Sequence, residues 1–222
     1  MPSVLSWKKL IAGITLLSIG FVLGMAVRPP EDKSAVVDLD AFLKDLYDYG
    51  LKNNMWNVRP ADGKFLQLLV AATGAKKVLE LGTANGYSGI WICRGLAETG
   101  GALTTVELNA RKAAEAKANF AKVGVASRVK VLDGDARKVI PTLNETYDLI
   151  FMDTEKGDYL DQFKLALPLL KPGGVFLAHN AILMRDSMKD FLEALDKHPD
   201  LTTAIVQTSD DGFSVSYRKI NK

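Results

Sequence analysis

Short apolar segments alternate with segments of helical periodicity from about residue 36 onward, and this alternation constrains the fold more than any other feature. The apolar segments are near-continuously hydrophobic, which is typical of parallel strands buried on both faces. We expect such strands at residues 76–82, 102–108, 128–135, 147–153 and 173–180. Helices between successive strands would cover both faces of the sheet. The sequence therefore predicts an α/β fold with a doubly wound, mostly parallel sheet.

The C-terminal part departs from this alternation. Two further strand segments, residues 202–209 and 212–220, are separated only by Asp210 and Asp211. This connection is too short for the crossover that parallel strands need, so the last strand should pair antiparallel. Asn109 is expected to cap the helix that it precedes. The expected helices cover residues 35–51, 61–74, 87–100, 109–124, 136–143, 159–170 and 184–198.

The N-terminus carries a separate signal. Residues 10–27 contain no charged side chain, and Lys8 and Lys9 precede them. At about 1.5 Å per residue this run would span roughly 27 Å, close to the roughly 30 Å of a bilayer core. We expect a single-pass membrane anchor and linker at residues 1–34, followed by one domain at residues 35–222.

Two alternatives stay open for this segment. Gly24 and Ala26 suit a small-residue cleavage site, so a cleaved signal peptide with export of the domain is the second interpretation. By the positive-inside rule, Lys8 and Lys9 would place the domain on the side away from the cytoplasm, unless this bias is overridden.

Composition excludes several classes of function. A net charge of +2 without a basic tract argues against a nucleic-acid partner. The single cysteine, Cys93, forms no internal disulfide, and with only two histidines beside it a thiolate-rich zinc site is excluded.

Polar residues gather at the predicted carboxyl ends of the strands. Ligands of open parallel sheets bind at this edge, so these residues are candidates for a binding site. They are Glu80, Glu107, Asp135, Asp153, His179 and Asn180.

The loop after the first strand, residues 80–89, narrows the choice of ligand. Gly82 and Gly86 are four positions apart, which does not match the G-x-G-x-x-G fingerprint of dinucleotide sites. Glu80 at the start of the loop would repel a pyrophosphate and suit a cationic ligand. Glu107 is placed to accept hydrogen bonds from a ribose, with Asp135 beside the base. An ordinary glycine-rich turn is the alternative.

Five motifs follow one another along the domain: E-L-G-T-A-N-G-Y-S-G, V-E-L, G-D-A, M-D-T-E-K-G-D-Y and G-G-V-F-L-A-H-N. Their order and spacing resemble the class I S-adenosylmethionine-dependent methyltransferases, and more narrowly the catechol and caffeoyl-CoA O-methyltransferase family. The resemblance covers about residues 55–220. It implies a Rossmann-like sheet, S-adenosylmethionine as cofactor and a small phenolic or catechol-like acceptor.

The resemblance also implies roles for the strand-end residues. The 80–88 loop would hold the methionine part of S-adenosylmethionine, Glu107 the ribose hydroxyls, and Asp135 with Ala136 would border the adenine. The implied cofactor-binding set is Glu80, Gly82, Thr83, Gly86, Tyr87, Ser88, Glu107, Asp135, Ala136 and Asp153.

A divalent cation, magnesium or manganese, is implied by the same resemblance. In the family, an Asp after the fourth strand and an Asp-Asn pair after the fifth bind the metal. Asp153 and Asn180 match the first and third ligands, but His179 stands in place of the second Asp. His179 could ligate a softer ion than magnesium. It could instead replace the metal and act as the base. As a third possibility, it is a structural histidine at the end of a strand, with its hydrogen bonds made within the protein, and the protein has no metal dependence.

Lys156, three positions after Asp153, matches the general base of the family, and Tyr159 also fits the pattern. A phenolic hydroxyl keeps its proton up to about pH 10, so methyl transfer needs a base and a Lewis acid. A solvated loop charge is the alternative interpretation of Lys156.

Two segments flank the expected site. Residues 58–66 resemble the family segment that closes over cofactor and acceptor; a loop with Asp62 as a helix cap is the alternative. Residues 181–187 are shorter than the family insertion that shapes the acceptor pocket, which predicts a more open acceptor site. By analogy with the family, a homodimer is also expected.

Three functional hypotheses follow. The first is a membrane-anchored, metal-assisted O-methyltransferase. The second is a metal-independent methyltransferase that uses Lys156 or His179 as base. The third is a non-catalytic nucleotide-binding module at a membrane.

Overall fold

The computed structural model of the chain describes residues 37–220. The predicted anchor at residues 10–27 lies outside these residues. Within residues 37–220, none of the helices combines the length and the apolar character that crossing a membrane requires.

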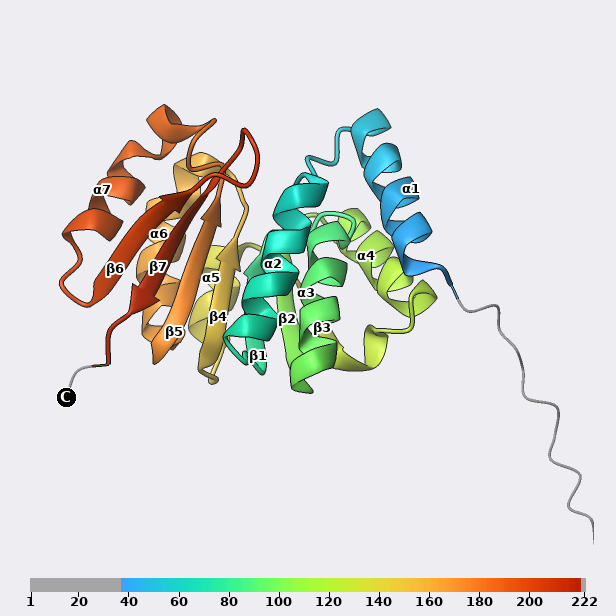
Figure 1. The fold of residues 1–222 in the computed structure, drawn as a ribbon, viewed down its shortest axis with the longest axis horizontal. Helices are drawn as coiled ribbons and strands as arrows, with labels where there is room; N and C mark the ends of the chain where they lie inside the picture. Colours follow the sequence, from blue (N-terminus) through green and yellow to red (C-terminus); the bar gives the residue numbers. More distant parts are fainter. Residues whose placement is uncertain (1–36, 221–222) are drawn as a thin grey trace, which may run out of the picture. The chain divides into compact units, whose positions relative to one another are not determined.

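A seven-stranded sheet forms the centre of the domain (Figure 1). Its strand order is β3-β2-β1-β4-β5-β7-β6. The first five strands along the chain pair in parallel, whereas β7 is antiparallel to both β5 and β6. The strands are β1 (Lys77–Leu81), β2 (Ala102–Glu107), β3 (Val129–Asp133), β4 (Tyr147–Met152), β5 (Leu170–His179), β6 (Leu201–Val206) and β7 (Phe213–Arg218). The predicted fold class, with its antiparallel last strand, is confirmed.

Helices lie on both faces of this sheet (Figure 1). They are α1 (Leu39–Lys52), α2 (Pro60–Ala72), α3 (Tyr87–Thr99), α4 (Ala110–Lys122), α5 (Ala136–Val139), α6 (Tyr159–Ala166) and α7 (Lys189–Lys197). Asn109 caps α4 as predicted, because its side chain accepts hydrogen bonds from the backbone of Arg111 and Lys112 at 3.0 and 3.2 Å.

Three helices are shorter than the sequence predicted. Pro141 and Pro168 follow α5 and α6 and lie in short 3-10 helices, because proline lacks the N–H that would continue an α-helix. Residues 185–188 form a third 3-10 helix ahead of α7.

Alternation along the strands divides the core into two layers. In β4, Leu149 and Phe151 pack among α1–α4, whereas Ile150 and Met152 pack among α5–α7. Both layers use fully buried side chains, so the strands read as continuous apolar runs in the sequence. This double burial holds the carboxyl ends of five parallel strands rigidly at one edge.

Candidate functional site

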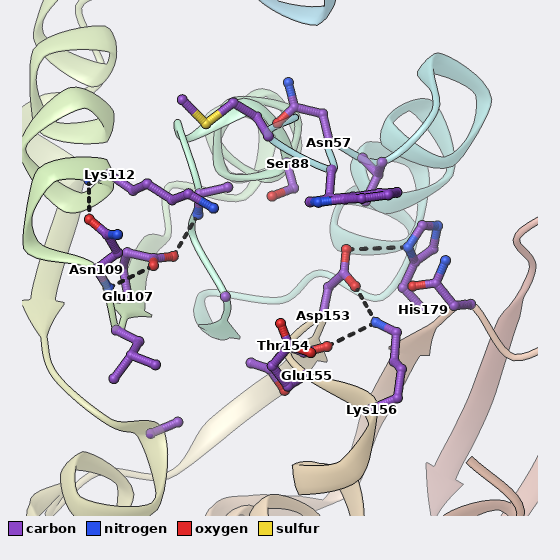
Figure 2. Close-up of a pocket in the computed structure, with 18 of the residues that line it drawn as sticks. Asn57, Ser88, Glu107, Asn109, Lys112, Asp153, Thr154, Glu155, Lys156 and His179 are labelled. Atoms are coloured by element: carbon purple, nitrogen blue, oxygen red, sulfur yellow. Dashed lines mark hydrogen bonds and ion pairs between the residues drawn. The ribbon is translucent and has the colours of Figure 1, made fainter. Parts of the chain in front are cut away.

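A cavity of about 850 Å³ opens at the carboxyl edge of the parallel strands. Its volume is in the range of pockets that enclose a cofactor with a small substrate. Figure 2 shows Glu107, Asn109 and Lys112 on one side of it, and Asp153, Lys156 and His179 on the other. Leu51, Met55, Trp56, Leu183 and Met184 add an apolar part to its wall.

The two sides meet where the strand order reverses, between β1 and β4. Asp153 N donates a hydrogen bond of 2.8 Å to Leu81 O. Gly82, with φ of +96°, approaches so closely that a Cβ there would lie 2.1 Å from Asp153 O. Only glycine fits this backbone, which brings the loop after β1 against the end of β4. The reversal point is the usual ligand position in such sheets.

Glu107, the last residue of β2, lies in the cavity wall and is 8% exposed. Its Oε2 accepts a hydrogen bond from Ala84 N at 2.8 Å, and its Oε1 accepts one from Asn109 N at 2.9 Å. These backbone donors fix the carboxylate at the edge of the cavity. Its position suits a carboxylate that accepts bonds from ligand hydroxyls.

Asp135 and Ala136 also line the cavity, beyond the end of β3. The Asp135 side chain caps α5 by accepting a hydrogen bond from Arg137 N at 2.9 Å. It also pairs with the Arg137 guanidinium, which, together with the backbone bond, lowers the pKa of Asp135. The pair forms a polar border at this end.

Four predicted cofactor contacts lie behind the wall rather than in it. Glu80 is fully buried, and its carboxylate accepts hydrogen bonds of 2.6 Å from Ser88 Oγ and from Thr105 Oγ1. Burial raises the pKa of Glu80 to about 7, against the effect of these two donors. Among the loop residues only Gly82, Ala84 and Ser88 line the cavity. The residues behind them are Glu80, Thr83, Gly86 and Tyr87.

These four residues are not part of the cavity wall, so their contact with a cofactor stays a prediction. Tyr87 packs against Tyr47 and Trp91 in the core. Thr83 hydrogen-bonds Thr105. Their physical role in this structure is to hold the loop whose backbone and Ser88 face the cavity.

Asp153 is the centre of the other side. Its Oδ1 accepts a hydrogen bond from Lys156 Nζ at 2.9 Å, and its Oδ2 lies 3.2 Å from His179 Nδ1. Burial disfavours the ionised form, but His179 and Lys156 outweigh it and hold the pKa of Asp153 well below its usual range. Lys156 Nζ also donates to Thr154 O at 2.9 Å and to Tyr159 Oη at 2.8 Å. Lys156 is therefore an anchored cavity residue and not a solvated loop charge.

His179 ends β5 and is 3% exposed. Its Nε2 lies 3.1 Å from Asp62 Oδ2, whereas its Nδ1 is buried and has no hydrogen-bond partner among the described residues. Burial disfavours a charged imidazole, but Asp153 and then Asp62 outweigh it and raise the pKa of His179 to about 9. The imidazole thus lies between two carboxylates.

Asp62 is a site residue for which the sequence suggested only a helix-capping role. It is fully buried in the first turn of α2 and accepts hydrogen bonds from Thr208 Oγ1 and, at 2.8 Å, from Ser209 Oγ. It does not cap the helix, since Arg59 is the N-cap and makes no side-chain capping bond. One signal could have found it: Asp62 shares a helix face with Leu66 and Val70, which are both fully buried.

Asn180 follows His179 and lines the cavity. Its φ of +65° is left-handed, a conformation in which asparagine is enriched among residues other than glycine. No described group hydrogen-bonds its side-chain amide, so its carbonyl oxygen is available to a ligand.

The donor set at this end fits a divalent cation. It comprises the Asp153 carboxylate, the unpartnered Nδ1 of His179 and the Asn180 oxygen. Asp62, His179 and Asp211 form a second group, whose ligand atoms lie within 4.8 Å of one another, but the Asp211 carboxylate accepts a hydrogen bond from Arg59 Nε at 2.8 Å. A nitrogen among the ligands favours first-row transition ions over magnesium.

Comparisons with known proteins agree with this geometry. A model of the O-methyltransferase family matches residues 31–200. A catechol O-methyltransferase of Mycobacterium tuberculosis is 34% identical over 72% of this chain and 79% of its own length. One of Niastella koreensis is 42% identical over 57% of this chain and 58% of its own, so the match spans little more than half of that relative.

Solved structures of O-methyltransferases share this fold. The crystal structure of an O-methyltransferase from Bacillus cereus in complex with SAH superposes with a TM-score of 0.75 and 30% identity, over 84% of this chain and 94% of that one. The cavity edge, the strand order and these matches lead to one assignment. The chain belongs to the O-methyltransferase family and is an S-adenosylmethionine-dependent O-methyltransferase.

Proposed function

We propose that this chain transfers the methyl group of S-adenosylmethionine to a hydroxyl of a small phenolic or catechol-like acceptor, assisted by a divalent cation. One observation carries the proposal. A single cavity joins a carboxylate suited to a ribose, Glu107, to the anchored array of Asp153, Lys156 and His179. The apolar side chains around its mouth suit the ring of an aromatic acceptor.

On the cofactor side, Glu107 would accept hydrogen bonds from the ribose hydroxyls, and Asp135 with Ala136 would border the adenine. Gly82 and Ser88 would contact the methionine part. Glu80 would act indirectly: its carboxylate accepts a hydrogen bond from the Ser88 hydroxyl and so orients it. The sulfonium carries positive charge, and the Asp153 carboxylate lies on the cavity side toward which it would point.

On the acceptor side, Lys156 would act as the base. In its neutral form, which a neighbouring cation would favour, its amine would take the proton of the acceptor hydroxyl, and the oxygen lone pair forms the new C–O bond to the methyl group. The C–S bond breaks at the same time, and its electron pair remains on sulfur as S-adenosylhomocysteine. Nζ is held in place by hydrogen bonds to Asp153, Thr154 and Tyr159. The base is therefore oriented before the reaction begins, which lowers the entropic part of the barrier.

Asp153, His179 and Asn180 would hold the cation. When bound, it supplies a Lewis acid that polarises the acceptor oxygen. The metal-independent mechanism is the second candidate, since the paired His179 already places a cationic group beside Asp153. Full turnover in the presence of a chelator would favour it.

Residues 10–27 are proposed to anchor the chain in a membrane. Membrane fractionation of the full chain, compared with a chain that begins at residue 35, tests this. Recovery of both in the same fraction would contradict it. The homodimer stays a prediction, which light scattering of the purified chain can check.

The first experiment is calorimetric titration of the full chain with S-adenosylmethionine, followed by methyl transfer to catechol with and without manganese. NAD is the matched control titrant, because the glycine spacing argues against a dinucleotide. Binding of S-adenosylmethionine but not NAD, with transfer to catechol, supports the proposal. Cofactor binding with no transfer to any phenol would refute the acceptor class.

A further inference from the structure

We propose that Asp62 is a positioning residue that presents His179 as a nitrogen ligand, and that the site therefore prefers manganese or another first-row transition ion to magnesium. This inference rests on the proposed function, because it concerns the cation of the same cavity. It assigns a role to a buried carboxylate that belongs to none of the sequence motifs.

The contact between Asp62 and His179 decides which ring nitrogen carries a proton. Thr208 and Ser209 both donate hydrogen bonds to the Asp62 carboxylate. An ionised carboxylate only accepts hydrogen bonds, so Nε2 of His179, 3.1 Å away, is its third donor. When a bound cation takes the place of the other proton of the imidazole, the lone pair that faces it is on Nδ1.

Nδ1 faces Asp153, the first of the other candidate ligands. It is buried and has no hydrogen-bond partner of good geometry among the described residues, and Asp153 Oδ2, 3.2 Å away, is its ion-pair partner. Two ligand atoms at right angles about one ion, each at about 2.1 Å, would be separated by about 3 Å. The observed spacing is close to this value.

Asp62 is itself held from outside the site. Thr208 and Ser209, in the turn between β6 and β7, both donate to its carboxylate. Its side chain is fully buried and cannot turn away from the imidazole without leaving hydroxyl groups unpaired. Carboxylates that accept the second N–H of a metal-bound histidine fix its tautomer and raise its basicity. Asp62 has this position.

The choice of metal follows from the ligand set. One carboxylate, one imidazole and one amide oxygen carry less negative charge than two carboxylates and an amide. Magnesium prefers oxygen ligands and loses affinity with each missing carboxylate. Imidazole suits manganese less than copper or zinc, but better than it suits magnesium.

The test measures metal binding by the full-length chain, with magnesium and manganese as the probes. Manganese binding is followed by electron paramagnetic resonance, with pulsed detection of nitrogen coupling, and magnesium by competition. The variants are Asp62→Asn, His179→Asp and, as a matched control, Asp211→Asn. The control removes the same charge near His179 but no hydrogen bond to its ring.

We expect a directly bound nitrogen in the wild-type spectrum and its loss in H179D. D62N should weaken manganese binding by about 10- to 100-fold, whereas D211N should change it by less than about threefold. H179D should lower the preference for manganese over magnesium by at least roughly tenfold. Ser209→Ala, a milder change, should weaken manganese binding in the same direction as D62N if the latter folds poorly.

Two results would overturn the inference. One is a manganese spectrum without bound nitrogen, and the other is an equal loss of affinity in D62N and D211N. A wild-type chain that binds S-adenosylmethionine and methylates catechol but binds no metal would refute the inference and leave the methyl-transfer proposal standing. Failure to bind S-adenosylmethionine would refute the proposed function itself.

Discussion

Glu80 and Asp153 are carboxylates at the ends of the neighbouring strands β1 and β4, yet their pKa values shift in opposite directions. Glu80 has only hydroxyl donors, and burial raises its pKa to about 7. Asp153, whose side chain is 15% exposed, is also partly desolvated, but His179 and Lys156 hold its pKa well below the usual range. The partners of each carboxylate set the direction of its shift.

This contrast separates the two halves of the cavity. On the cofactor side, Glu80 and Glu107 are met by hydroxyl and backbone N–H groups, and Asp135, at the outer end, pairs with the Arg137 guanidinium. On the acceptor side, Asp153 is met by Lys156 and His179, and Asp62 by His179 and two hydroxyl groups. The cofactor half is suited to bind the uncharged hydroxyl groups of a ribose, and the acceptor half is suited to move protons.

The largest expected effect is on chemistry in the acceptor half. Replacing Lys156 with Met should lower kcat by about 10²- to 10⁴-fold, because the proton acceptor is lost. The affinity for S-adenosylmethionine should change by less than about threefold. Steady-state kinetics and calorimetry measure the two quantities. Lys112→Met, which removes a lysine from the cofactor side of the cavity, is the control; an equal loss of kcat there would break the distinction between the halves.

The second prediction is that removing the charge of Asp153 and that of Glu80 changes the free energy of unfolding in opposite directions. Asp153→Asn leaves the buried His179 and the half-buried Lys156 without their common carboxylate, and we expect it to lower the free energy of unfolding by about 3 kcal/mol at pH 8. The same chemical change at Glu80, to Gln, should raise it, because it removes a buried charge without a cationic partner. Urea unfolding of both variants measures this. Two changes of the same sign would contradict the comparison.

The pH dependence of stability sharpens the same point. The folded pKa of Glu80 is raised from 4.5 to about 7, so its contribution is fully present below about pH 4.5 and is lost as the pH rises to about 7. The loss amounts to about 3 kcal/mol relative to the Gln variant. Denaturation midpoints of wild type and Glu80→Gln between pH 4 and 9 should diverge over this window. Parallel curves would show that Glu80 titrates normally.

The last prediction concerns the backbone that joins the halves, where the smallest change is expected in the control, Gly74→Ala. Gly82→Ala adds a clash with Asp153 O to an unfavourable φ, and should cost about 3 kcal/mol and weaken cofactor binding. Gly74→Ala has a similar φ of +67° but open space around it, and should cost only about 1 kcal/mol. Thermal unfolding of both variants isolates the contribution of close approach. Equal costs would mean that contact with β4 does not constrain Gly82.

The sequence predicted the sheet, because continuous apolar strands such as Leu149–Met152 leave few alternatives. It also predicted the strand-end residues that line the cavity, including Glu107, Asp153 and Lys156. It did not separate Ser88, which faces the cavity, from Glu80 behind it, because the path of a loop between Gly82 and Gly86 depends on tertiary contacts. The site role of Asp62 was missed because its partners lie about 117 to 147 positions away, where local pattern carries no information.

That separation has a consequence for the order in which the chain can mature. Asp62 is held by Thr208 and Ser209, so the acceptor half depends on a turn that is translated after all five parallel strands. A nascent chain that has emerged only through β5 already carries Glu107, Asp135 and His179 but lacks the groups that hold the imidazole from behind. During synthesis, the residues of the cofactor half are therefore all present before the acceptor half is complete.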